Sequence, residues 1–141
     1  MKYKKILLAV DGSEHSQRAA AAAADLATGK DAEILLLTCY NTGVVEDEQP
    51  FLDAGQFSKL AAEAKQVLKP YEDMLRARGI VFTPQVQSGI PESAITQVAK
   101  EEQCDLIVMG SRGLGKVMGL LLGSVTMTVV QKAPCSVLVV R

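Results

Sequence analysis

The sequence predicts an α/β fold: an open, five-stranded parallel sheet with helices on both faces. Short apolar runs alternate along the chain with longer segments in which apolar residues recur at helical spacing. Strands that are apolar on both sides are typical of parallel sheets covered on both faces. The 141 residues contain neither an internal repeat nor a linker, so we expect a single domain over residues 1–141.

The first part of the chain is predicted to form two strands with a helix between them. The apolar run at Lys5–Asp11 predicts the first strand, and the run at Glu33–Tyr40 predicts the second. Ser13 is a candidate N-cap for a helix that continues through an alanine-rich stretch to Thr28. Gly29 follows as a candidate C-terminal cap.

The middle of the chain predicts a loop, a long helix and a weaker strand. Asn41–Gln56 is polar and mixed, and we expect an irregular loop there. Apolar residues then recur at helical spacing over Phe57–Leu75, and Pro70 should kink that helix. Ile80–Gln87 predicts the third strand, which Pro84 favours at a sheet edge.

The last part of the chain predicts two helices and two strands. Pro91 suits the first turn of a helix that runs to about Gln103, because the N–H that proline lacks is unpaired there. Asp105–Gly110 predicts the fourth strand, Ser124–Lys132 the last helix, and Ser136–Val140 the closing strand. We expect the strand order 3-2-1-4-5, as in doubly wound folds.

Composition excludes several classes of function. Fifteen Lys and Arg against sixteen Asp and Glu leave no basic excess for nucleic acid. The longest strongly apolar stretch, 117–123, is too short to span a membrane. The three cysteines are far apart without a C-x-x-C pair, which indicates a reducing compartment. We therefore expect a cytoplasmic protein that binds neither nucleic acid nor membrane.

The residues that follow the first and the fourth predicted strands suggest a ligand-binding site. Asp11 follows the first strand, and a glycine-rich loop after the fourth strand has the spacing Gly110, two residues, Gly113, nine residues, Gly123, then Ser124 at a helix start. Glycines let backbone N–H groups approach an anion, and a helix N-terminus adds further N–H groups and a positive dipole end. A plain surface loop and a capping role for Asp11 are the alternatives. The loop fits neither a P-loop nor the dinucleotide pattern.

Three segments resemble the universal stress protein family: Ala9–Ser13, Met109–Gly113 and Gly123–Val125. The likeness covers essentially the whole chain, and the glycine spacing is similar to that of the ATP-binding subgroup. The resemblance implies an adenine nucleotide alpha-hydrolase-like fold and a stress-response protein that binds ATP. AMP and ADP stay open as alternatives.

The resemblance also implies a role for each matching residue. Asp11 would contact the ribose or the adenine edge, and the backbone of Cys39 would meet the adenine ring. The other residues implied at the site line the pocket or hold ribose and phosphates: Ala9, Met109, Gly110, Gly113, Gly123, Ser124 and Val125. Arg112 and Lys116 lie in the loop where phosphates would be. We expect Mg or Mn to be held through the phosphates and water, because no acidic pair is placed to ligate it.

Two other functions stay open beside that of a nucleotide-dependent binder or switch. One is a nucleotide hydrolase or an adenylyl-transferring enzyme that uses Lys116, Arg112 or His15, although no catalytic set stands out and any ATP hydrolysis should be slow. The other is a dimeric interaction module without a ligand. The closing strand Val137, Leu138, Val139 and Val140 is apolar and has no proline, so we expect it to pair with a second copy in a homodimer.

Overall fold

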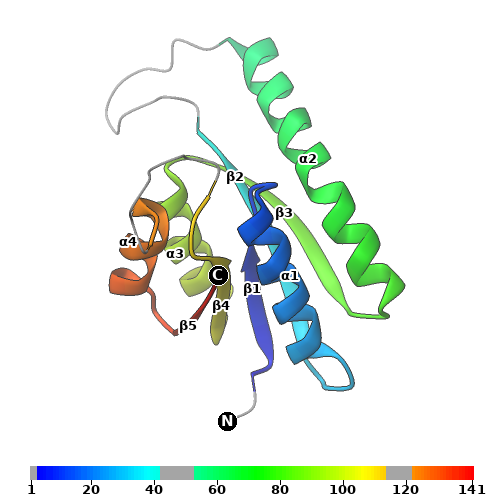
Figure 1. Ribbon diagram of the computed structural model, residues 1–141. Coiled ribbons are helices and arrows are strands. Elements are labelled where there is room, and N and C mark those ends of the chain that lie inside the picture. Colours follow the sequence, from blue (N-terminus) through cyan, green and yellow to red (C-terminus); the bar gives the residue numbers. More distant parts are fainter. Residues whose placement is uncertain (1–2, 42–52, 114–121) are drawn as a thin grey trace.

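A computed structural model describes residues 3–41, 53–113 and 122–141 (Figure 1). The strands of these residues form one parallel sheet in the order β3-β2-β1-β4-β5, which confirms the predicted fold and order. The strands are β1 (Lys5–Ala9), β2 (Glu33–Tyr40), β3 (Phe82–Ser88), β4 (Leu106–Gly110) and β5 (Ser136–Val140).

Helices cover both faces of the sheet (Figure 1). The helices are α1 (Glu14–Ala27), α2 (Ala54–Ala77), α3 (Pro91–Glu101) and α4 (Ser124–Lys132). Along β1, Ile6 and Leu8 join the apolar cluster under α1 and α2, whereas Leu7 joins the cluster under α3 and α4. Ile6, Leu7 and Leu8 are completely buried. The central strand thus supplies both layers of the core, as its continuous apolar run predicts.

The strand register places the carboxyl ends of β1 and β4 at the same end of the sheet. Leu8 lies opposite Val108 in β4 and opposite Leu36 in β2. Parallel strands paired in this way end together, so the turn after β1 and the loop after β4 leave the sheet side by side. Doubly wound sheets bind their ligands at these carboxyl ends of the strands.

The two sheet edges differ. β3 forms one edge, as Pro84 predicts, and β5 forms the other. Ile34 donates its N–H to the carbonyl of Val81, and because backbone groups alternate sides along a strand, Pro84 turns its nitrogen away from β2. A proline is therefore accommodated in β3 without loss of a ladder hydrogen bond.

Helix α2 starts earlier than the sequence predicts. The predicted loop Asn41–Gln56 is wrong at its end, because α2 begins at Ala54; residues 42–52 lie outside the described part of the chain. Asp53 caps the helix: its Oδ1 accepts from the Gln56 N–H at 2.8 Å, and Gln56 Oε1 accepts from the Asp53 N–H at 2.9 Å. This reciprocal capping box satisfies two backbone donors at the helix start. α2 then continues through Pro70 as one helix.

The other residues predicted to start or end helices do so in the structure. Ser13 caps α1 by accepting from the Ser16 N–H, Pro91 is the first residue of α3, and Ser124 is the first residue of α4. Gly29 and Gly79 follow α1 and α2 with φ of +71° and +68°, the left-handed conformation that ends helices. Among the helices described, none has the length and hydropathy to cross a membrane.

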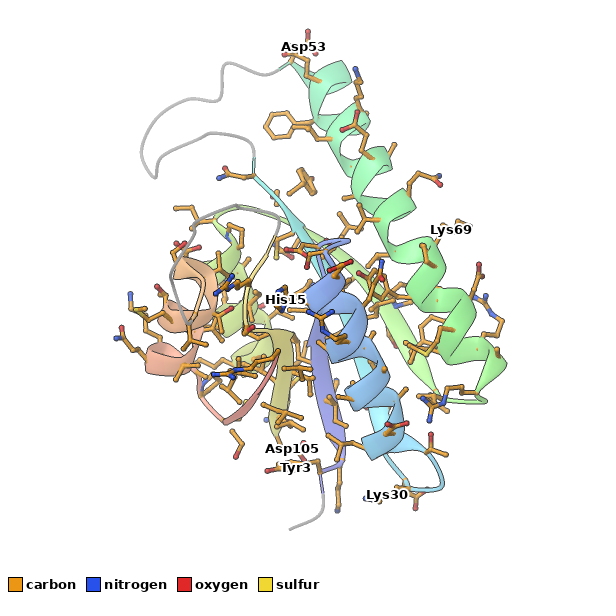
Figure 2. The ribbon with its side chains drawn as sticks, viewed as in Figure 1. Tyr3, His15, Lys30, Asp53, Lys69 and Asp105 are labelled. Carbon is orange, nitrogen blue, oxygen red and sulfur yellow. The ribbon has the colours of Figure 1, made fainter. Side chains whose placement is uncertain are left out.

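Removal of the α2 cap should destabilise the fold. Asp53 lies at the exposed start of α2 (Figure 2). We expect Asp53→Ala to lower the free energy of unfolding by about 0.5–2 kcal/mol, because the Gln56 N–H loses the carboxylate that accepts its hydrogen bond. Urea denaturation measures the effect, with Lys59→Ala on the exposed surface of the same helix as the control. Equal stability of the two variants would contradict the role of the cap.

Candidate functional site

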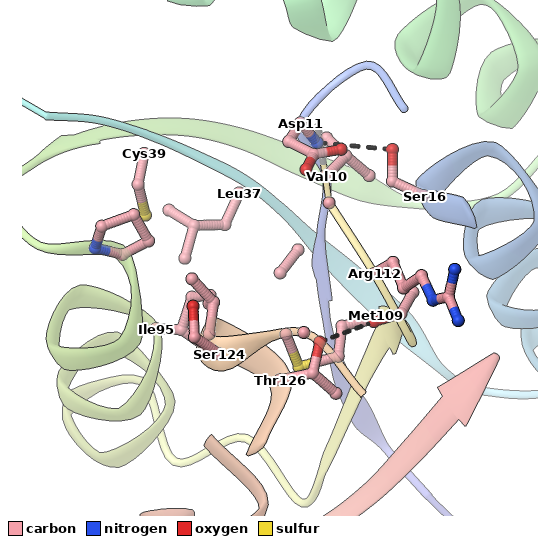
Figure 3. Close-up of a pocket in the computed structure, with 16 residues that line it drawn as sticks. Val10, Asp11, Ser16, Leu37, Cys39, Ile95, Met109, Arg112, Ser124 and Thr126 are labelled. Carbon is pink, nitrogen blue, oxygen red and sulfur yellow. Dashed lines mark hydrogen bonds between the residues drawn. The ribbon is translucent and has the colours of Figure 1, made fainter. Parts of the chain in front are cut away.

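A cavity of about 270 Å³ lies at the carboxyl ends of β1 and β4, next to the N-terminus of α4 (Figure 3). All ten residues that the sequence assigns to a site line it: Ala9, Asp11, Cys39, Met109, Gly110, Arg112, Gly113, Gly123, Ser124 and Val125. The remaining lining residues were not predicted: Val10, Ser16, Leu37, Pro91, Ile95 and Thr126. Segments far apart in sequence therefore meet around one concave space.

The turn after β1 holds the Asp11 carboxylate in place. Asp11 Oδ1 accepts the Ser13 N–H at 2.9 Å, and the Asp11 N–H donates to Ser16 Oγ at 3.3 Å. Gly12 has a φ of +87°, a conformation that other residues adopt only with strain. Before the turn, Val10 is tied to β2, because its carbonyl accepts from Thr38 Oγ1 at 2.7 Å. The carboxylate thus has a defined orientation at the rim of the cavity.

Glycines after β4 allow the loop to pack closely. A Cβ at Gly110 would lie 2.7 Å from His15 Cβ and 2.8 Å from the His15 backbone carbon. A Cβ at Gly113 would lie 2.6 Å from Asp11 Oδ2. Gly110 therefore lets α1 approach β4, and Gly113 brings the loop backbone against the Asp11 carboxylate.

The first turn of α4 faces the cavity. Gly123 donates its N–H to the Ser111 carbonyl at 2.7 Å, and Thr126 Oγ1 donates to the Gly110 carbonyl at 2.9 Å. Both bonds fix the start of α4 beside the glycine loop. No side chain of the described residues caps this helix, and Gly123 and the first three residues of α4 line the cavity. An N-terminus in this arrangement attracts anions.

The opposite part of the lining is apolar. Leu37 and Met109 are buried members of the core beneath α3 and α4, and Ile95 of α3 joins them. Figure 3 shows Cys39, Ile95 and Ser124 on one side of the cavity and Asp11 and Ser16 on the other. Burial raises the pKa of the Cys39 thiol to about 12, so this thiol is neutral at physiological pH and is not an activated nucleophile.

Unlike Met109, Leu37 and Ile95 could not be assigned to the site from the sequence, because their side chains reach the cavity only through the tertiary arrangement. One signal was present: Ile95 belongs to the apolar face of the predicted helix. Ser16 and Thr126 carry a different signal, since each is a polar residue within an otherwise apolar helix face. Both are buried.

The three basic residues considered for catalysis are placed differently. His15, at the start of α1 (Figure 2), does not line the cavity; its Nδ1 lies 3.3 Å from Ser111 Oγ and 3.2 Å from Arg18 Nη2. Arg112 lines the cavity, but its guanidinium points toward the α1 side and away from Ser124 (Figure 3). Lys116, like Gly115 and Gly119, lies outside the described residues.

The described part of the chain offers few ligands for a metal ion. Within 3–41, 53–113 and 122–141, no group of three or more His, Cys, Asp or Glu side chains is placed to hold a metal ion. Asp11 is the one acidic side chain among the described residues lining the cavity. A metal at this site would need most of its ligands from a bound anion and from water.

The sheet order and the cavity at the carboxyl ends of the strands define an α/β protein of the doubly wound type. The sequence pattern of the universal stress protein family matches residues 2–141. A universal stress protein from Thermus aquaticus, encoded in the 3′ region of a QAH/OAS sulfhydrylase, is 40% identical over 146 residues that cover 99% of both chains. The chain therefore belongs to the universal stress protein family, and its fold is adenine nucleotide alpha-hydrolase-like.

Solved structures agree with this assignment. The structure of the hypothetical protein MJ0577 has a TM-score of 0.89 and 33% identity, and the match covers 99% of this chain and 96% of that one. A universal stress protein solved in complex with cAMP has a TM-score of 0.76 and 27% identity, and that match covers 100% and 98% of the two chains.

Replacement of Gly110 should disturb the site through its packing. In Gly110→Ala the new methyl group would overlap His15, so α1 or β4 must shift; we expect a loss of about 1–3 kcal/mol in the free energy of unfolding. The matched control is Gly123→Ala, whose Cβ would meet nothing closer than 3.5 Å. Thermal or urea denaturation compares the two variants. Equal stability of Gly110→Ala and the unmodified protein would contradict the close approach of α1 to β4.

Proposed function

We propose that this protein binds an adenine nucleotide in the cavity, with ATP as the first candidate and AMP or ADP as alternatives, and acts as a nucleotide-dependent binder or switch in the stress response. One observation carries the proposal: Asp11, the glycine loop after β4 and the N-terminus of α4 converge on one partly apolar cavity. The complex of a family member with cAMP supports an adenine nucleotide as the ligand class.

Each part of the cavity suits a part of the nucleotide. The N-terminus of α4 and the backbone of Gly110 and Gly113 would receive phosphates, which needs no net positive charge. The apolar surface of Leu37, Ile95 and Met109 would pack against the adenine ring, with the Cys39 backbone at its polar edge.

Asp11 would accept a hydrogen bond from a ribose hydroxyl, because a carboxylate offers acceptors only. Mg or Mn, if bound, would be held through the phosphates and water, where it would neutralise phosphate charge. The free state of all three cysteines is in keeping with a role in the reducing cytoplasm.

The first experiment is mass spectrometry of the small molecules released when freshly purified protein is denatured. The proposal predicts an adenine nucleotide near one per chain, or binding of added ATP with an increase in melting temperature. A protein that arrives empty and does not respond to excess ATP would favour the interaction module without a ligand. Turnover above about 1 per second would favour the hydrolase.

Two substitutions test the site assignment. Asp11→Ala should weaken adenosine-nucleotide binding by about 1–3 kcal/mol, because a buried hydrogen bond to the nucleotide is lost. Gly123→Val should block the path of the phosphates between Gly113 and the start of α4, whereas the smaller Gly123→Ala serves as its control. Isothermal titration calorimetry measures all three affinities. Unchanged affinity in Asp11→Ala and Gly123→Val would refute the assigned site.

We also propose that the protein is a homodimer that pairs through β5. β5 pairs with β4 and is the last strand of the sheet that the described residues form. Apolar side chains are exposed on it and on the neighbouring α4: Leu138 at 37%, Met127 at 45% and Val130 at 46%. An exposed apolar edge of this kind promotes association unless it is paired.

Sedimentation should therefore show a dimer at micromolar concentration. We expect Leu138→Lys to shift the population to monomer, because a charge would be desolvated at the interface. Lys59→Ala, on the opposite side of the sheet, is the control and should leave the dimer intact. A clean monomer for the unmodified protein would refute the dimer.

A further inference from the structure

A buried hydrogen bond joins α2 to the first turn of α1, which directly follows the turn that carries Asp11. The Tyr71 hydroxyl oxygen lies 2.6 Å from Ser16 Oγ. Tyr71 is 4% exposed and Ser16 is 3% exposed. Tyr71 does not line the cavity. Its hydroxyl is therefore a buried polar group with a hydrogen bond to a residue that does line the cavity, Ser16.

The hydrogen-bonding capacity of Ser16 assigns the direction of that bond. Ser16 Oγ accepts the Asp11 N–H at 3.3 Å and donates its own hydrogen to the Ser13 carbonyl at 3.1 Å. A serine hydroxyl has one hydrogen and two acceptor positions. Since the hydrogen is directed at Ser13, Tyr71 is the donor to Ser16, and the hydroxyl of Ser16 is then fully paired.

The phenol of Tyr71 is protonated at physiological pH. Burial raises the pKa of Tyr71 above its usual value, so the phenol keeps the hydrogen that it donates to Ser16.

An apolar contact of α2 reinforces this polar one. Val67, one helical turn before Tyr71, lies on the same face of α2. Its Cγ1 would be 3.9 Å from a Cβ built on Gly12. The turn between β1 and α1 and the first turn of α1 are thus packed against Val67 and Tyr71 of α2.

We propose that Tyr71 is a positioning residue for the nucleotide site: through Ser16 it holds the Asp11 turn in the orientation that binds the nucleotide, and so couples α2 to nucleotide affinity. The proposal rests on the proposed function and adds to it a residue that does not touch the ligand. Its consequence is that affinity depends on a hydroxyl outside the cavity.

The test is Tyr71→Phe, which removes the hydroxyl and keeps the packing of the ring. We expect ATP affinity measured by calorimetry to fall about fivefold, the change that loss of one net hydrogen bond produces. In the nucleotide-free protein, exchange of the Asp11 and Gly12 amide hydrogens, measured by NMR, should become faster. The control is Leu75→Val, a completely buried position one turn further along α2, which should change neither the affinity nor these two amides.

A double-mutant cycle shows whether Tyr71 acts through Ser16. In a Ser16→Ala background, Tyr71→Phe should have no further effect on affinity. Additive effects, or an equal loss of affinity in Leu75→Val, would overturn the proposal in favour of general destabilisation. Unchanged affinity in Tyr71→Phe beside ATP binding by the unmodified protein would overturn the Tyr71 proposal alone. Failure of the unmodified protein to bind ATP, with faster exchange in Tyr71→Phe, would overturn the proposed function while the turn-holding role stands.

Discussion

The parallel pairing of β1 with β4 is the constraint on which the rest of the molecule depends. Apart from Lys5 at the start of β1, both strands are apolar and buried on both faces, so a slip of one residue would exchange the side chains of the two core layers. The register that satisfies the core also makes the two strands end together. The Asp11 turn and the glycine loop meet because the core requires it, and the cavity lies where they meet.

Close packing at this junction explains why small residues gather there. Gly110 has no room for a side chain because α1 begins against it, and Gly113 lies against the Asp11 carboxylate. Hydrogen bonds add to this packing. Thr126 Oγ1 donates to the Gly110 carbonyl and so ties α4 to the end of β4, and Ser16 Oγ accepts from the Asp11 N–H and from the Tyr71 hydroxyl. Among the described residues, Asp11 and Arg112 are the charged ones that line the cavity, one of each sign.

Much of this arrangement could be predicted from the sequence, because its signals are local. Apolar runs marked the strands, Ser13 and Gly29 marked the ends of α1, and the glycine spacing marked the loop after β4. The start of α2 was missed although Asp53 and Gln56 have capping-box spacing, since the polar composition around them is equally typical of a loop. Leu37, Ile95 and Tyr71 could not be assigned to the site or its support, because only packing between distant segments places them there.

The unequal edges of the sheet limit how copies of the chain can assemble. Pro84 turns a nitrogen without hydrogen toward the free side of β3, so a further strand would find a donor missing there. β5 has no such interruption. A sheet that could extend at both edges could polymerise into open fibres. If copies of this chain pair edge to edge through β5, as proposed, the pairing would end at two subunits, and Pro84 at the far edge would oppose the growth of fibres.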